Sequence, residues 1–261
     1  MVEILKMVLL AIVQGVTEFL PVSSSGHLVL GRELLGLEMG SGGMLEVVLH
    51  AGTLVSVVLF YRGRVRALLS GIKRGDGASV RYVGLVALGI VPAVVFGLLA
   101  RSGLGDMFDR PLWAGVFLMV TGGYLLLTHW VPSASRELGV RSVVLIGLVQ
   151  MLALLPGISR SGSTICTARM LGVAPKVAAE FSFMMSIPLL LGVVLFEGIS
   201  GWRAYTMDVD EAGLLALGFA VSAAVGYAAL RWLVSLLERG RFWRFGIYCL
   251  FVGAVSLFWL S

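Results

Sequence analysis

Residues 14–28 have the sequence QGVTEFLPVSSSGHL, a polar stretch inside a chain that is otherwise strongly hydrophobic. Gln14 and Glu18 are four residues apart, so a helix places both on one face. A carboxylate at membrane depth costs about 2.5–3.5 kcal/mol on insertion scales, so Glu18 needs a functional or pairing role. Pro21 ends this helix and the apolar run after the serines starts another, which predicts two helices joined by a polar break. Hydroxyls and free N–H groups at the start of the second helix are typical of an anion site.

The composition predicts a polytopic membrane protein. The chain has 261 residues, of which 58% are hydrophobic and 13% charged, and its mean hydropathy is +0.97. The net charge is +5, and the basic residues lie in a few short loops, so we expect no nucleic-acid partner. The N-terminus lacks a charged region and a cleavage site, so we expect no signal peptide. Cys166 and Cys249 lie in apolar surroundings without metal-ligand spacing and are expected to be free, buried thiols.

Hydropathy along the chain predicts two interrupted segments and six full spans within a single domain, residues 1–261. Residues 3–20 with 26–37, and the segment 142–172, are too short or too interrupted to span comfortably, which indicates two re-entrant helical hairpins with polar breaks at their tips. The full spans are expected at about 44–60, 82–100, 112–130, 177–199, 211–236 and 243–260.

The two halves of the chain, about 1–130 and 142–261, each contain one hairpin followed by three spans. The hairpins also match in sequence, since FLPVSSSGHLVLGRELLG resembles LLPGISRSGSTICTARMLG. An odd number of spans in each half reverses the orientation of the second copy. The predicted fold is therefore an all-α polytopic membrane protein with an inverted-topology repeat, an architecture that places sites near the membrane midplane.

The distribution of basic residues among the loops predicts the orientation. Loops 61–81, 131–141 and 237–244 fall on one side and carry eleven Lys and Arg residues, whereas loops 101–110 and 200–210 fall on the other and carry three. The basic side is expected to be cytoplasmic. The first hairpin would then enter from outside and the second from the cytoplasm, which favours a site open to the outer face and leaves a cytoplasmic opening as the alternative.

The tip of the second hairpin, residues 156–164, has the sequence PGISRSGST. Its Arg160 carries a planar, permanently charged guanidinium that suits phosphate oxygens. The serines and glycines around it can add hydroxyl and backbone N–H contacts. If the tips meet, Arg160 faces Glu18 and His27, which would combine charge compensation with acid–base chemistry.

QGVTEFLPVSSSGHL and PGISRSGST together resemble the motifs of the undecaprenyl-pyrophosphate phosphatase family, the bacitracin-resistance type of integral membrane phosphatase. The resemblance extends over nearly the whole chain. It implies removal of one phosphate from undecaprenyl pyrophosphate or a related polyprenyl pyrophosphate, which regenerates a lipid carrier for cell-wall glycans. It also implies a multi-pass protein of the inner, or plasma, membrane and a divalent cation, for which Mg²⁺ or Ca²⁺ suits oxygen ligands.

The resemblance and the chemistry together imply roles for the motif residues. Glu18 and Gln14 are expected to bind the cation, and Glu18 could instead orient His27. The nucleophile is expected to be Ser24 with His27 as general base; His27 itself and a water activated by Glu18 and metal are the alternatives. The expected pyrophosphate-binding residues are Ser23, Ser25, Gly26, Ser159, Arg160, Ser161, Gly162 and Thr164.

Plainer interpretations apply to several of these residues. Serines and glycines in membrane helices are often packing devices, and this alternative is strong for Ser23, Ser163 and Thr164. Glu46 and Glu180 are expected to cap a span or to brace the hairpins rather than to react, and His50, one helical turn after Glu46, is expected to support the site from outside it. A transporter or flippase of phosphorylated polyprenyl lipid is the rival function, because inverted repeats with broken helices are a transporter architecture. The expected partners are the polyprenyl pyrophosphate, membrane lipid and a second copy of the chain in a homodimer.

Overall fold

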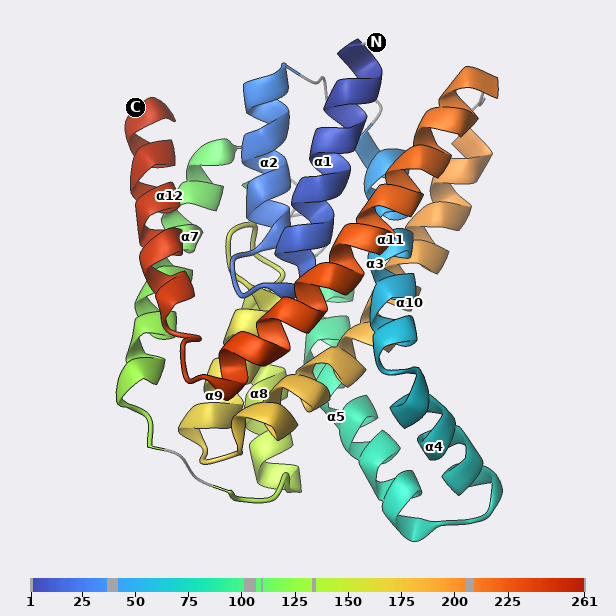
Figure 1. Ribbon diagram of the computed structural model, residues 1–261, viewed down its shortest axis with the longest axis vertical. Helices are drawn as coiled ribbons and strands as arrows, with labels where there is room; N and C mark the ends of the chain where they lie inside the picture. The colour runs from blue at the N-terminus through green and yellow to red at the C-terminus, as the bar shows by residue number, and fades with distance from the viewer. Residues whose placement is uncertain are drawn as a thin grey trace.

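The computed structural model describes residues 2–36, 42–100, 107–108, 110–132, 135–204 and 209–260 (Figure 1). These residues form a bundle of α-helices, and within them β pairing is limited to one isolated bridge. The helices are α1 (Val2–Phe19), α2 (Ser24–Leu35), α3 (Gly42–Phe60), α4 (Arg62–Lys73), α5 (Gly77–Leu99), α7 (Pro111–Leu127), α8 (Val140–Leu152), α9 (Arg160–Met170), α10 (Pro175–Ala204), α11 (Val209–Glu238) and α12 (Arg244–Leu260). A short 3₁₀ turn, η2 (Thr128–Trp130), extends α7.

The two predicted hairpins are confirmed as α1–α2 and α8–α9. In each, the second helix begins with a serine N-cap: the Ser23 hydroxyl accepts the Gly26 N–H, and the Ser159 hydroxyl accepts the Gly162 N–H. These bonds satisfy part of the helix N-terminus where the chain is broken. The hairpins enter the bundle from opposite ends (Figure 1), as the predicted orientation requires. An internal two-fold relation between the halves stays a prediction.

Four described helices are long and apolar enough to cross a membrane, and they coincide with the predicted spans 82–100, 112–130, 177–199 and 211–236. The predicted span 44–60 continues into α4 through a bend of 74° at Tyr61. Helix α12 occupies the sixth span but has only 17 residues. The described part of the chain is thus a multi-pass membrane protein.

The basic segment 61–81 differs from the predicted loop, because most of it is helical. Helix α4 buries Leu68 and exposes most of its basic side chains. Asp76 caps α5 by accepting the N–H groups of Ala78 and Ser79. Hydrogen bonds from the Ser79 hydroxyl and from these N–H groups hold the pKa of the Asp76 carboxyl below its ordinary value. Local capping and one apolar stripe therefore suffice to fold this connection.

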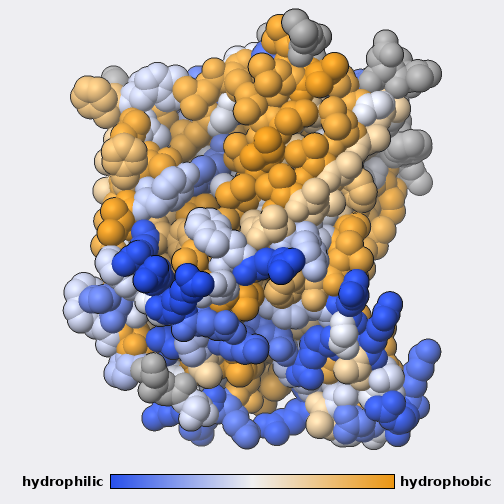
Figure 2. Space-filling view, in the orientation of Figure 1, coloured by the Kyte–Doolittle hydropathy of each residue, from blue (hydrophilic) through white to orange (hydrophobic). Residues whose placement is uncertain are grey.

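The basic connections gather at one end of the bundle. The chain passes between α4 and α5, α7 and α8, and α11 and α12 in the lower half of Figure 1, whereas both termini lie at the top. Figure 2 shows hydrophilic residues over this lower end and hydrophobic residues over the rest of the visible face. Most of loop 101–110 and residues 205–208 lie outside the described residues. For these two loops, the comparison of Lys and Arg numbers between the two sides of the membrane uses the sequence alone.

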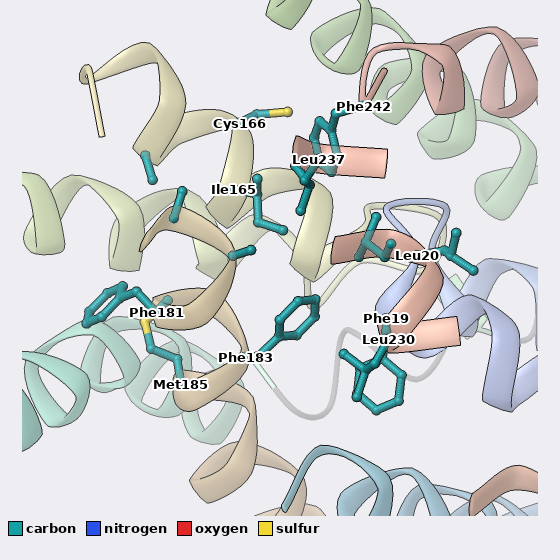
Figure 3. Packing of buried hydrophobic residues seen from close by; sticks show 14 of the residues in the cluster. Phe19, Leu20, Ile165, Cys166, Phe181, Phe183, Met185, Leu230, Leu237 and Phe242 are labelled. Atoms are coloured by element: carbon teal, nitrogen blue, oxygen red, sulfur yellow. The ribbon is translucent and has the colours of Figure 1, made fainter. Parts of the chain in front are cut away.

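The apolar core connects both hairpin tips to the long helices (Figure 3). Phe19 at the end of α1 packs edge to face against Phe183 of α10, with ring centroids 5.8 Å apart. Ile165 of α9 and Leu230 of α11 belong to the same cluster and are fully buried. The broken helices are therefore fixed by apolar packing on the side away from their polar tips.

The tips touch through glycine. A Cβ atom added to Gly26 would lie 2.9 Å from the Gly157 Cα, so this pair lets the two breaks approach closely. Gly157 has φ 101°, a backbone conformation that favours glycine. A Cβ at Gly157 would also collide with the Ala114 carbonyl oxygen of α7. The juxtaposition of the tips thus depends on two small residues.

We expect Gly157→Ala to lower the melting temperature by several degrees in detergent, because left-handed strain costs about 1–3 kcal/mol before the collision with α7 is counted. Gly123→Ala is the matched control: it lies in α7, and a Cβ there meets nothing within 4 Å. Fluorescence-monitored melting distinguishes the two variants. Equal melting of Gly157→Ala and wild type would contradict the close contact.

Candidate active site

Glu18 is the centre of a polar cluster where the two tips meet. It lies in the last turn of α1, and its carboxylate accepts three hydrogen bonds from different directions. Gln14 Nε2 donates at 3.1 Å and Ser24 Oγ at 2.7 Å to one oxygen, and an Arg160 guanidinium nitrogen donates at 3.0 Å to the other. The predicted meeting of Glu18 with Arg160 is confirmed.

The Glu18–Arg160 ion pair is shielded from solvent. Only 7% of the Glu18 side chain and 16% of the Arg160 side chain are exposed. A second guanidinium nitrogen donates to the Ser182 carbonyl of α10 at 3.4 Å, and the Ser182 hydroxyl bonds Thr164 at 2.6 Å. Charged groups pay a large desolvation penalty unless their hydrogen bonds are satisfied, and this network supplies them.

The first tip contains a strained backbone. Ser23 has φ 68°, the only positive φ among the described non-glycine residues. Its carbonyl accepts both the His27 N–H and the His27 ring Nδ1–H, at 3.2 and 2.8 Å, and its hydroxyl bonds Ser25 at 3.2 Å. A conformation of this kind costs about 1–3 kcal/mol and persists only where its surroundings hold it. The serine run is therefore preorganised by His27.

His27 does not face Ser24. Its Nδ1 donates to the Ser23 carbonyl, and its Nε2 lies 2.8 Å from the Tyr248 hydroxyl of α12. Its ring stacks on the Tyr248 ring with centroids 5.6 Å apart. The expected pair of Ser24 with His27 as general base is thus not formed in this geometry, because the four-residue local bond to Ser23 turns the imidazole to the other side of α2. Ser24 instead donates to Glu18.

The histidine close to Glu18 is His50 of α3. Its Nε2 lies 3.8 Å from a Glu18 carboxylate oxygen, and its Nδ1 donates to the Glu46 carbonyl at 2.7 Å. The Glu46 carboxylate pairs with Arg32 of α2 at 2.9 Å. These two residues brace the first hairpin, as expected.

Glu180 is engaged away from this cluster. Its carboxylate pairs with Arg64 of α4 at 2.8 Å, and the Arg64 guanidinium lies 4.6 Å from the centre of the Tyr82 ring. Glu180 therefore ties α10 to the α4–α5 connection.

A cavity of about 450 Å³ opens beside the cluster. Its polar lining comes mainly from both tips and from α3, with one residue each from α8 and α10, and its apolar lining comes largely from α5, α8 and α10. The polar residues that line it are Glu18, Ser23, Ser24, Ser25, Glu46, His50, Gln150, Arg160 and Glu197. Serine hydroxyls and a guanidinium, together with apolar side chains in the same cavity, suit a phosphorylated lipid.

The other predicted residues of the second tip are turned into the protein. Ser161 Oγ donates to the Leu20 carbonyl at 3.2 Å, Ser163 Oγ to the Ser159 carbonyl at 2.6 Å, and Thr164 Oγ1 to the Arg160 carbonyl at 2.8 Å. These hydroxyls hold the tip in place. Among the serines, the threonine and the arginine of this tip, Arg160 is the residue that lines the cavity.

Gln150 is a cavity residue that the motif analysis did not identify. It is 1% exposed, its Nε2 donates to the Gly89 carbonyl at 3.2 Å, and its Oε1 is buried without a partner. A buried orphan acceptor is costly, so its position in the wall indicates a ligand contact. The signal was a glutamine inside a hydrophobic segment, which helix packing could equally explain.

The expected divalent cation is compatible with these residues only in combination with a substrate. The described part of the chain contains no cluster of three or more His, Cys, Asp or Glu side chains with metal-binding geometry. Glu18 is present, and the Oε1 atom of Gln14 is buried without a partner, so two oxygen donors from the predicted pair exist. Mg²⁺ typically uses one or two carboxylates together with phosphate oxygens. A pyrophosphate would have to supply the remaining ligands.

Comparison with known proteins identifies the chain. The family model described as "Bacitracin resistance protein BacA" matches residues 7–255. A relative from Rhizorhabdus wittichii is 36% identical over 99% of this chain and 98% of its own length, and one from Rhodopirellula baltica is 39% identical over 97% and 96%. A third, from Desulfatibacillum aliphaticivorans, is 38% identical over 97% of each chain, and all three are named undecaprenyl-diphosphatase. The chain therefore belongs to the BacA family of bacitracin resistance proteins.

Proposed function

We propose that the protein is an integral membrane phosphatase that hydrolyses undecaprenyl pyrophosphate to the monophosphate and inorganic phosphate. The observation that carries this proposal is the buried Glu18–Ser24–Arg160 cluster in the wall of the cavity. It combines a nucleophile, a proton acceptor and a phosphate-binding cation within hydrogen-bond reach. The names of relatives that match almost the whole chain support the same substrate.

The geometry supports Ser24 as nucleophile with Glu18 as its base. Ser24 Oγ attacks the terminal phosphorus while its proton passes to Glu18 and on to the leaving phosphate. The bond from that phosphorus to the bridging oxygen breaks, and this oxygen departs with the polyprenyl monophosphate. Water then attacks the phosphoserine, inorganic phosphate leaves, and the proton from water returns through Glu18 to Ser24.

Arg160 supplies the positive charge that this reaction requires. Its guanidinium pairs with Glu18 in the absence of substrate, and phosphate oxygens would compete for the same donors. Preorganised donors in a water-poor site stabilise developing charge more than they would in water. A divalent cation, Mg²⁺ or Ca²⁺, would be held by Glu18 and Gln14 with the pyrophosphate and would neutralise further charge there.

The proposed setting is the inner, or plasma, membrane with the basic loops on the cytoplasmic side. The first hairpin then opens outward, which favours hydrolysis at the outer face and recycling of the carrier lipid for cell-wall glycans. A homodimer stays a prediction. The rival transporter function would use Arg160 to hold phosphate but has no need of the Ser24–Glu18 hydrogen bond.

Removal of Arg160 tests the proposal directly. We expect wild-type protein in lipid nanodiscs to release phosphate from undecaprenyl pyrophosphate and Arg160→Ala to lose at least 100-fold in rate, or about 2.7 kcal/mol. Arg169→Ala, on the same helix but bonded to the Val131 carbonyl, is the control and is expected to retain activity. Absence of release by folded wild-type protein would instead favour the transporter.

The variant His27→Asn distinguishes the two candidate general bases, Glu18 and His27. Asparagine can keep a donor for the Ser23 carbonyl but cannot titrate, so we expect substantial activity and an unchanged pH profile, whereas Ser24→Ala loses at least 100-fold. His27→Ala should fall between them, because the strained Ser23 loses a partner. If His27→Asn is as inactive as Ser24→Ala, His27 is the base and its ring must turn during the reaction.

Removal of divalent ions tests the cation. We expect a chelator to abolish phosphate release and added Mg²⁺ or Ca²⁺ to restore it. Gln14→Leu should raise the cation concentration needed for half-maximal activity, since it removes one neutral oxygen beside Glu18. Full activity in chelator would show that Arg160 alone compensates the phosphate charge.

A further inference from the structure

A second hollow, the α11–α12 groove, lies on the outer surface of the bundle. It has a volume of about 460 Å³, and none of its lining residues belongs to the catalytic cavity. Its walls are apolar and come from the first hairpin tip, from α11 and from α12. They include Val16, Leu20, Val22, Trp232 and Phe245. A lining of this kind suits a hydrocarbon chain better than a compact polar ligand.

Two arginines lie in the wall of this groove, on the connection that leads from α11 into α12. Arg241 and Arg244 line it and are exposed. Neither pairs with a carboxylate among the described residues, whereas neighbouring Glu238 pairs with Lys176 at 3.9 Å. The Arg244 guanidinium lies 5.8 Å from the centre of the Trp243 ring, a contact that leaves its N–H donors available.

The position of this pair matches a lipid headgroup. The α11–α12 connection belongs to the hydrophilic, basic end of the bundle (Figures 1 and 2). With this end at the membrane surface, headgroup phosphates of the adjacent leaflet would reach the two arginines, and acyl chains would extend toward the apolar belt. Basic residues at this level gain about 1 kcal/mol each from anionic lipid. Two arginines without a carboxylate partner thus lie beside an apolar groove, an arrangement that a phosphate with an attached acyl chain complements.

We propose that the α11–α12 groove is a binding site for an anionic phospholipid, such as phosphatidylglycerol, of the leaflet on the basic side. Arg241 and Arg244 hold the phosphate, and one acyl chain lies along Trp232, Phe245 and the hairpin tip. The occupant is a phospholipid because the charge lies at one end of a lipid-facing apolar surface. A soluble anion would leave the apolar part of the groove exposed to membrane.

The groove also adjoins the first hairpin, α1–α2, on the side of α2 to which His27 points. Tyr248 lines the groove, and its hydroxyl lies 2.8 Å from His27 Nε2, while His27 Nδ1 donates to the strained Ser23. A bound acyl chain would therefore pack against the support of the serine run. The binding itself is independent of the phosphatase reaction and can be measured without it.

Native mass spectrometry of protein incubated with equal amounts of dioleoyl phosphatidylglycerol and dioleoyl phosphatidylcholine tests the site. We expect wild type to retain one phosphatidylglycerol preferentially. The double variant Arg241→Gln with Arg244→Gln should bind it at least tenfold more weakly. Arg62→Gln with Arg66→Gln is the matched control: it removes the same charge at the same end, from exposed positions on α4 outside the groove, and should bind like wild type.

A second variant tests the apolar part separately. Leu236→Trp fills the groove and leaves both arginines, so it should also reduce retention of phosphatidylglycerol. Melting temperatures in detergent establish that each variant is folded. Unchanged retention by the groove double variant would overturn the proposal, as would an equal loss in the α4 control, because either result would show diffuse attraction instead of a site.

Discussion

The ion pair between Glu18 and Arg160 is the interaction on which the rest of the site depends. It joins residues 142 positions apart and links the end of α1 to the start of α9, both of which lie inside the bundle. Removing one partner of such a buried pair leaves an uncompensated charge and typically costs about 3–5 kcal/mol. Gln14 and Ser24 donate further hydrogen bonds to the Glu18 carboxylate, and the Arg160 guanidinium donates one to the Ser182 carbonyl. The pair thus stabilises the contact between the tips. It also holds in position the carboxylate and the guanidinium that take part in the proposed reaction.

Breaking a helix inside the bundle leaves backbone N–H and C=O groups without partners, and both tips satisfy part of them in the same way. Serine N-caps at Ser23 and Ser159 accept N–H groups three residues on, and glycines let the two backbones approach. The second tip uses its remaining hydroxyls for internal bonds, whereas the first leaves Ser24 and Ser25 in the cavity wall. Similar sequences therefore serve different purposes: the second tip positions an arginine, and the first presents hydroxyls.

The first hairpin separates two environments. Glu18 and Ser24 face a polar cavity, while His27 on the opposite side of α2 reaches Tyr248 at the α11–α12 groove. One short helix thus connects the proposed chemistry with the proposed lipid site. The connection passes through Ser23, whose carbonyl accepts the His27 ring and whose backbone is strained.

Sequence alone determined which segments enter the membrane, where they break and which residues are polar at those breaks. Hydrophobic runs, prolines and serine caps act over a few neighbouring residues, so their effect can be predicted without knowledge of the fold. The pairing of Glu18 with Arg160 was also predictable, because two charges at corresponding breaks need each other. Only the tertiary structure decided which way each side chain turned. His27 bonds a carbonyl four residues back and a tyrosine 221 residues away, His50 comes beside Glu18 from another helix, and Gln150 reaches the cavity. These placements depend on the rotation and packing of whole helices, and spacing within one segment carries no information about either.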